Sequence, residues 1–194
     1  MTYEKNFLAG KKTALSKLNK AQKEKKVDLG ILPILDIINK SEDYYTSSSC
    51  YGRTVLLEIP KIGNKKEAKF LGKWHREIKV DEIISASKNA KKGQLWLLSQ
   101  STIIHIIAKT NEVAEKMLKT AISSGFKNSG LKSFGKKIVI EICSTERLDS
   151  PIGKDGLILC DKKYLDLLTN ISNEIIIKSS MKIEKFKKNL EQLI

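Results

Sequence analysis

Two runs of strand-forming residues, 95–99 and 102–108, are separated by only two residues. Parallel neighbours in a sheet need a crossover connection of roughly a dozen residues or more. The connection here is too short for a crossover, so the two runs are predicted either to pair in antiparallel fashion or to form one bent strand. This constraint favours a sheet whose strands are joined by tight turns.

A second alternating segment covers residues 70–78. Phe70, Trp74 and Ile78 are expected on one face of that strand. Lys73 and His75 are expected on its other face. Further strands are predicted at 44–48, 54–59, 126–133, 137–144 and 157–160, with a turn at 63–66 and a polar connection at 145–156.

Helices are predicted at residues 6–26, from Pro33 onward, at 80–90, at 111–125 with Asn111 as the cap, and at 161–193. A break in the last helix is expected near Ser179 and Ser180. Strands paired without crossovers and interleaved with helices predict an α+β fold, in which a mixed, largely antiparallel sheet is covered by helices.

A chain of 194 residues suffices for one sizeable domain or for two small intertwined halves. We predict a single domain, 1–194, with an N-terminal basic helix (6–26), a mixed-sheet core (44–160) and a C-terminal helical segment (161–193). The sequence has no G-x-G-x-x-G after a strand, no Walker loop and no nucleophile elbow. It therefore does not signal a Rossmann fold.

The formal net charge of +14 indicates a polyanionic partner, and nucleic acid is the favoured one. The helix at 6–26 concentrates lysines on one side of a thin apolar stripe, which predicts a phosphate-binding face. A Lys-rich protein from a hot or salty cell is the alternative.

No apolar run follows Met1, so no signal peptide is expected. The longest uncharged segment, 93–108, is shorter than the roughly 20 residues of a spanning helix. Cys50, Cys143 and Cys160 are odd in number and widely spaced, which favours a reducing compartment. We expect a soluble cytoplasmic protein with no membrane association and no structural metal.

Residues 44–53, YYTSSSCYGR, combine a hydroxyl run with a thiol, a glycine and an arginine. Gly52 allows a sharp bend, and Arg53 offers a planar fork for phosphate or carboxylate. These groups predict a site, although a Ser-rich edge strand and turn is the alternative. Cys50 is a possible nucleophile beside Arg53, whereas Cys143 and Cys160 are expected to be inert packing residues.

The chain has two histidines, His75 and His105. His75 lies between cations that favour its neutral form, so it is either a proton acceptor or an exposed strand-end residue. His105 lies in an apolar run, where a hydrogen-bonded core role competes with a site role.

Residues 125–130, GFKNSG, offer an aromatic ring for stacking on a base at Phe126 and a cation at Lys127. The alternative is a helix C-cap with Phe126 in the core. Trp74 and Trp96 are expected in the core by default.

Taken together, five segments resemble the tRNA wybutosine-synthesizing protein 3 family. They are, in order, TSSSCYGR (46–53), KWHR (73–76), LWLLSQSTIIHI (95–106), SGFKNSGL (124–131) and ERLDSPIG (146–153). The likeness spans about residues 5–190 and matches the compact, stand-alone archaeal type. The hydroxyl run is one Ser longer than the family pattern, and Tyr51 replaces a small residue.

The resemblance implies an S-adenosylmethionine-dependent methyltransferase with a non-Rossmann fold. It implies methylation of N4 of the tricyclic, guanosine-derived base just 3′ of the anticodon of tRNA-Phe, with the anticodon loop as the bound element. A non-enzymatic basic RNA-binding or chaperone protein is the alternative, and a thiol-dependent hydrolase is a third.

On this interpretation the turn at 47–53 and residues 125–130 form the walls of one pocket. Arg53 or Lys127 would bind the carboxylate of the donor or an RNA phosphate, and His75 would accept the proton lost from N4. The catalytic candidates are His75, Ser49 and Cys50. The candidates for binding are Ser47, Ser48, Gly52, Arg53, Lys73, Trp74, His105, Phe126, Lys127, Asn128, Ser129, Gly130 and Arg147.

Overall fold

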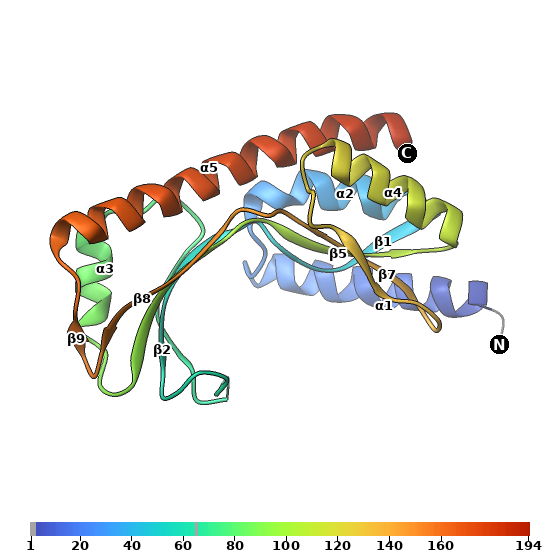
Figure 1. Ribbon diagram of the computed structural model, residues 1–194. Coiled ribbons are helices and arrows are strands. Elements are labelled where there is room, and N and C mark those ends of the chain that lie inside the picture. Colours follow the sequence, from blue (N-terminus) through green and yellow to red (C-terminus); the bar gives the residue numbers. More distant parts are fainter. Residues whose placement is uncertain (1–2, 65) are drawn as a thin grey trace. The chain divides into compact units, whose positions relative to one another are not determined.

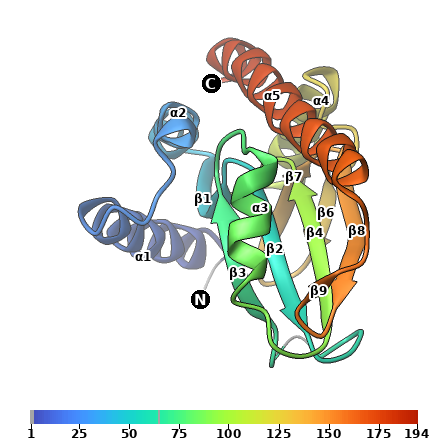
Figure 2. The ribbon, with the colours of Figure 1, turned by 90° about the vertical axis from the view of Figure 1, so that its left-hand side faces the viewer.

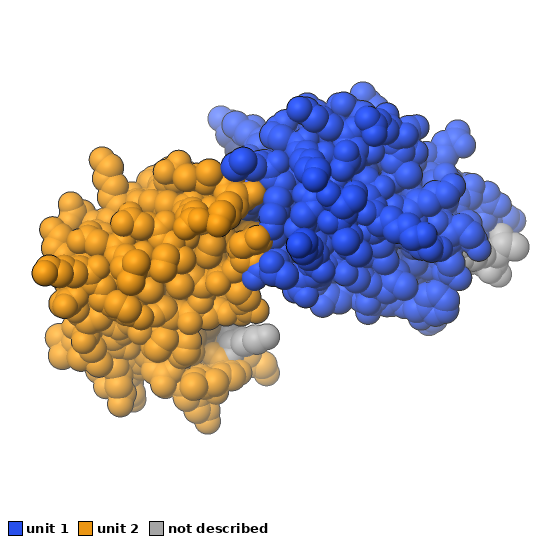
Figure 3. Space-filling model, turned by 45° about the horizontal axis from the view of Figure 1, so that its top comes forward, with its two compact units in different colours: residues 1–51, 102–145, 179–194 blue, residues 52–101, 146–178 orange. Residues whose placement is uncertain are grey.

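The structure is a computed structural model that describes residues 3–64 and 66–194. The chain divides into two compact units (Figure 3). Unit 1 contains residues 1–51, 102–145 and 179–194, and unit 2 contains residues 52–101 and 146–178. Each unit is therefore assembled from segments that lie far apart in the sequence. Their action as one domain stays a prediction.

Unit 1 contains a four-stranded sheet with the strand order β1-β5-β7-β6. Its strands are β1 (Tyr44–Cys50), β5 (Ile103–Ala108), β6 (Gly130–Ser133) and β7 (Ile138–Cys143). Its helices are α1 (Tyr3–Lys23), η1 (Leu29–Ile31), α2 (Leu32–Lys40), α4 (Asn111–Ser123) and the end of α5 (Lys162–Leu193). All the strand pairs are antiparallel.

Alternation along β5 and β7 gives the unit 1 sheet two different faces. Ile104, Ile106 and Ile140 are buried in a core with α2, α4 and the end of α5. On the opposite face, Tyr45 and Ile107 pack against α1 through Phe7, and the rings of Phe7 and Tyr45 meet edge-on with centroids 5.1 Å apart. Figure 1 shows α1 alone on its side of β1, β5 and β7. We call this side the α1 face.

Unit 2 contains a five-stranded antiparallel sheet with the order β3-β2-β4-β8-β9. The strands are β2 (Arg53–Ile59), β3 (Lys69–Trp74), β4 (Gln94–Gln100), β8 (Arg147–Lys154) and β9 (Leu157–Ile158). The helix α3 (Val80–Ser87) lies against one face of this sheet (Figure 2). Ile83 of α3 and Leu165 of α5 pack there on Leu56, Leu95 and Leu97.

The predicted α+β fold is confirmed, because antiparallel sheets covered by helices form both units.

The predicted antiparallel pairing of residues 95–99 with residues 102–108 is wrong. The strand β4 pairs with β2 and β8, whereas β5 pairs with β1 and β7. The chain therefore leaves one sheet and enters the other within two residues, which is closer to the bent-strand alternative.

Other local predictions also need correction. Residues 147–154 form strand β8 rather than a polar connection, and Pro151 is tolerated there because it lies at a register shift beside Trp96. The helix α5 continues without a break through Ser179. Thr110, not Asn111, caps α4, since its Oγ1 accepts the N–H of Val113. Among the described residues, no helix combines the length and apolar character needed to cross a bilayer.

Candidate functional site

A row of polar side chains crosses the α1 face of unit 1. Ser48 on β1 is paired in register with His105 on β5, and His105 is paired with Glu141 on β7. Tyr45, Ile107 and Val139 form the neighbouring apolar row, which α1 covers. The alternation of the strands thus places a serine, an imidazole and a carboxylate side by side at the edge of an apolar patch.

The three polar side chains are joined by short hydrogen bonds. The Oγ of Ser48 lies 2.8 Å from Nδ1 of His105, and Nε2 of His105 lies 2.9 Å from Oε2 of Glu141. Lys132 on β6 contacts the other carboxylate oxygen, with Nζ 2.6 Å from Oε1. These contacts connect all four strands of the sheet.

The charges around Glu141 hold it in its ionised form. Burial opposes ionisation, but the hydrogen bonds from Lys132 and His105 outweigh it, so the pKa of the Glu141 carboxyl lies below its usual value. The neighbouring thiol of Cys143 has a raised pKa, because it is desolvated and lies near Glu141. Cys143 donates to the carbonyl oxygen of Asn128 at 3.1 Å, in agreement with the inert role predicted for it.

A β-bulge shapes the hydroxyl run of β1. The register with β5 shifts between Thr46 and Ser48, so Ser47 is the extra residue. Thr46 is buried and donates its N–H to Oδ1 of Asn39 at 2.8 Å, whereas Ser47 and Ser48 are exposed. The bulge therefore accommodates one extra hydroxyl residue in β1.

A pocket of about 850 Å³ lies between α1 and β1 in unit 1. Ser47, Ser48 and Ser49 line it from β1, and small α1 residues such as Gly10 and Ala14 line it from the helix. Its charged lining residues are Lys17, Lys26, Asp28, Lys136 and Lys137. Cations therefore exceed carboxylates four to one in the lining, and the pocket suits a ligand that carries a carboxylate or phosphate beside hydroxyl or amide groups.

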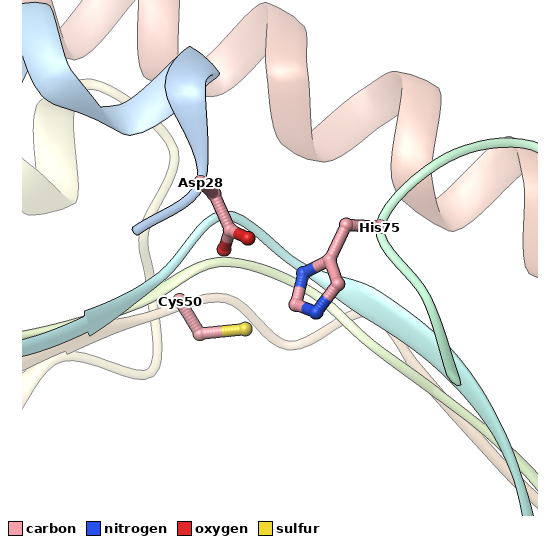
Figure 4. Close-up of side chains that lie close together, drawn as sticks. All are labelled: Asp28, Cys50 and His75. Carbon is pink, nitrogen blue, oxygen red and sulfur yellow. The ribbon is translucent and has the colours of Figure 1, made fainter. Parts of the chain in front are cut away.

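Asp28 fixes the end of β1. Its Oδ2 accepts the backbone N–H of Tyr51 at 2.9 Å, next to Cys50. Figure 4 shows the side chains of Asp28 and Cys50 in unit 1. His75, the third side chain that it labels, belongs to unit 2, where it is half-buried just after the end of β3. Cys50 is half-buried.

Residues 125–130 form the turn between α4 and β6. Phe126 is fully buried with its ring edge-on to Phe186, at a centroid distance of 5.6 Å, so its packing fits the core alternative rather than base stacking. Ser129 bonds to the carbonyl of Phe126 at 2.7 Å and accepts the N–H of Cys143 at 3.2 Å. Lys127 and Asn128 are exposed, and Gly130 opens β6.

The other sequence-predicted residues belong to unit 2. Arg53 donates from Nε to Gln100 at 3.3 Å, and its guanidinium lies 5.8 Å from the ring centroid of Phe70. The ammonium of Lys73 lies 4.7 Å from the same centroid. Phe70 was expected on the face of Trp74 and Ile78, yet it is 53% exposed. Its position on the edge strand β3 leaves it uncovered in unit 2.

The remaining unit 2 candidates have local contacts. The indole of Trp74 lies over Gly72 of the same strand, and Trp74 is half-buried. Arg147 pairs with Asp149 on β8, and Gly52 is buried with φ +115°.

The structure brings some of the candidates together and adds others. Ser48 and His105 are in direct contact, and Arg53 and Lys73 share Phe70. The walls of the α1–β1 pocket come from other segments than 125–130, so those residues do not form its second wall. Sequence reasoning missed Glu141, Lys132 and Phe70. A lone carboxylate inside the apolar run at 138–143 was the available signal for Glu141.

The chain is similar to known methyltransferases along its whole length. Residues 9–192 match the family described as Methyltransferase TYW3. A Pyrococcus abyssi protein is 42% identical over 194 residues, covers 100% of both chains and is named tRNA(Phe) 7-((3-amino-3-carboxypropyl)-4-demethylwyosine(37)-N(4))-methyltransferase 1. A Methanocaldococcus jannaschii protein with the same name, without the final numeral, is 42% identical over 191 residues and covers 94% of this chain and 99% of its own.

Solved structures agree with these matches. The PH1069 protein from Pyrococcus horikoshii superposes with a TM-score of 0.93 at 41% identity and covers 98% of each chain. A hypothetical protein from Aeropyrum pernix superposes with a TM-score of 0.75 at 27% identity and covers 86% of this chain and 99% of its own.

Proposed function

The chain belongs to the Methyltransferase TYW3 family, and we propose from this premise that it methylates N4 of a 4-demethylwyosine-type base at position 37 of tRNA-Phe. The membership agrees with the resemblance noted in the sequence. The observation that carries the proposal is identity of about 42% along the full chain with relatives named for this reaction. We propose that the base is the one those names specify, with a 3-amino-3-carboxypropyl group at position 7.

The charge and shape of unit 1 support an RNA substrate. The α1–β1 pocket carries Lys17, Lys136 and Lys137 around exposed hydroxyls, which suits the phosphates and base edges of a nucleotide. A base in the anticodon loop is single-stranded, so it can be turned out of its stack without opening a duplex. We propose that the loop presents the base at position 37 to this unit.

We propose S-adenosylmethionine as the methyl donor. The pocket volume of about 850 Å³ falls within the range of roughly 300–1,000 Å³ typical of small-molecule sites. Hydroxyl groups on β1 and the carboxylate of Asp28 fit ribose and ammonium groups, and Lys17 fits a carboxylate. When bound, this donor supplies a methyl group on a sulfonium sulfur.

Methyl transfer depends chiefly on position, so the residues of the chain act as a rigid frame. A bond-forming reaction gains most of its rate from holding the reacting atoms in line at close range. The antiparallel ladder of β1, β5 and β7 holds Ser48 and His105 in register for this purpose. His75, Ser49 and Cys50 remain our predicted catalytic candidates outside that row.

The direct test is mass spectrometry of tRNA-Phe that carries the 4-demethyl precursor, after incubation with the protein and S-adenosylmethionine. A gain of one methyl group at position 37 is expected. Tight binding of the tRNA with no gain in mass, and no affinity for the donor in a titration, would instead indicate a passive RNA-binding protein. We further propose a cytoplasmic location, since the three cysteines are odd in number and widely spaced, as a reducing compartment favours.

A further inference from the structure

The row of Ser48, His105 and Glu141 has a defined direction of hydrogen bonding. An ionised carboxylate only accepts hydrogen bonds, so the proton between His105 and Glu141 belongs to Nε2. In the neutral ring, Nδ1 then carries a lone pair and accepts the hydroxyl proton of Ser48. Ser48 therefore donates to the imidazole of His105, and the imidazole donates to the carboxylate of Glu141.

One end of this row is open and the other is closed. Ser48 is exposed and lines the α1–β1 pocket. The side chains of His105 and Glu141 are only 29% and 15% exposed. A ligand in the pocket therefore reaches the row through the Oγ of Ser48.

We propose that Ser48, His105 and Glu141 form a proton relay that removes the proton from N4 of the target base as the methyl group is transferred. This inference rests on the proposed function and specifies its proton acceptor. Ser48 is the catalytic residue that touches the base. His105 receives the proton through Ser48, and Glu141 is a positioning residue that holds the imidazole in the required tautomer.

The bonds and charges of the step balance. The N4–H electron pair forms the N4–C bond, and the carbon–sulfur pair of the sulfonium donor stays on sulfur. The N4 proton goes to Oγ of Ser48 while the hydroxyl proton of Ser48 goes to Nδ1 of His105. The resulting imidazolium lies 2.9 Å from the carboxylate of Glu141, which stabilises its charge.

Several charged groups surround the relay and affect its pH response. Lys132 on β6 contacts Glu141, and the thiol of Cys143 on β7 lies 3.9 Å from the same carboxylate. The pocket lining adds the cations Lys17, Lys26, Lys136 and Lys137 and the carboxylate of Asp28. Ser48 is the residue in contact with Nδ1, so the proton reaches the imidazole through its hydroxyl.

The kinetic test compares pH–rate profiles for methylation of the precursor tRNA. In the wild type, the single-turnover rate is expected to fall at low pH, because a protonated imidazole cannot accept another proton. Ser48→Ala and His105→Gln should lower the rate about 100-fold or more, the lower end for general base catalysis, with little change in tRNA affinity. His105→Gln should also remove the fall in rate at low pH, which we call the acid limb of the profile. Glu115→Gln, on the exposed side of α4, is the matched control and should leave the profile unchanged.

The spectroscopic test needs neither tRNA nor donor. Long-range ¹H–¹⁵N NMR spectra resolve the tautomers of both histidines of the chain. His105 is expected as the Nε2–H tautomer in the wild type, and Glu141→Gln should shift it toward a mixture. His105 with its proton on Nδ1 would overturn the relay.

The two tests separate the relay from the proposed function. No methylation by the wild type would refute the proposed function, while the NMR result would still decide whether the row has the order of a relay. A normal wild-type rate with an unchanged acid limb in His105→Gln would reject the relay alone. Loss of that limb in His75→Gln instead would assign the proton to the other histidine.

Discussion

The Oγ1 of Thr102 lies 2.7 Å from the Oγ of Ser179, and both side chains are buried in unit 1. Thr102 also donates its N–H to the same Ser179 oxygen at 2.8 Å and its hydroxyl proton to the carbonyl of Tyr51 at 2.6 Å. Tyr51, Thr102 and Ser179 are the unit 1 residues at three of the points where the chain passes between the units. One threonine therefore ties together three distant segments of unit 1.

Replacing this threonine by its apolar isostere should destabilise unit 1. Thr102→Val removes the hydroxyl bonds to the carbonyl of Tyr51 and to Ser179, at a cost of about 1–3 kcal/mol, while the backbone N–H bond to Ser179 remains. Thr102→Ser keeps the hydroxyl and is the control. The midpoint of urea unfolding should drop clearly for valine and little for serine. Equal midpoints for the two variants would contradict the role of this network.

A second prediction concerns Phe70, which has cations on its exposed ring in unit 2. Exposed aromatic rings next to cations bind single-stranded RNA by stacking, at about 1–3 kcal/mol per base. Phe70→Ala should therefore weaken tRNA-Phe binding by about this amount in a filter-binding or anisotropy titration. Leu159→Ala removes another exposed apolar side chain of unit 2, which has no ring, and should have little effect. An equal loss of tRNA affinity in both variants would mean that Phe70 does not bind RNA by ring stacking.

Sequence patterns identified those features of the fold and site that depend on local chemistry. The hydroxyl run of β1 and His105 in its apolar strand stand out within a few residues of sequence, and the structure brings Ser48 and His105 into contact. Helix periodicity likewise placed α4 and most of α1, because an apolar stripe every three or four residues requires only one element.

Features that depend on strand register were not visible in the sequence. Glu141 contacts His105 because of the register in which β7 pairs with β5. A shift of this register by one residue would turn the Glu141 side chain toward the core. The separation of β4 and β5 into different sheets depends on partners 40 or more residues away, such as β1 and β8. The exposure of Phe70 follows from the position of β3 at a sheet edge, which its alternation pattern does not encode.

The pocket lysines lead to a third prediction, about salt dependence. Each phosphate contact contributes about one unit to the slope of log affinity against log salt. Lys136→Gln with Lys137→Gln should therefore weaken tRNA binding at low salt and reduce that slope by roughly two. The matched control is the pair Lys162→Gln and Lys163→Gln at the exposed start of α5. An identical slope for the two double variants would show that the charge acts only as a diffuse field.

A fourth prediction concerns Gly93 in unit 2. It has φ +98°, and a Cβ there would lie 2.3 Å from the carbonyl oxygen of Ile59. Gly63 has a similar φ of +86° but open space around it. Gly63→Ala should cost about 1–2 kcal/mol of stability for the left-handed backbone alone. Gly93→Ala should lower the stability clearly more, because the backbone at Ile59 must also move to make room for the new Cβ. Thermal unfolding of both variants measures the difference, and a smaller loss for Gly93→Ala would be inconsistent with this packing.

The final prediction is a pH dependence in unit 2. Hydrogen bonds from Arg76 and from the backbone N–H of Lys79 lower the pKa of Glu82 from 4.5 to about 2. Because the folded pKa is depressed, this stabilisation is fully present above the unfolded pKa and is lost as the pH falls through the folded value. Arg76 is 62% exposed, so solvent screening keeps the effect on stability small.

Glu82→Gln should therefore be less stable than the wild type at pH 6, and the difference should shrink between pH 4.5 and pH 2. Denaturant unfolding at a series of pH values measures it. Glu115→Gln provides the comparison, since Glu115 forms an exposed pair with Lys119 on one helix. A difference that stays constant down to pH 2 would contradict the depressed pKa of Glu82, because only the wild-type side chain takes up a proton in this range.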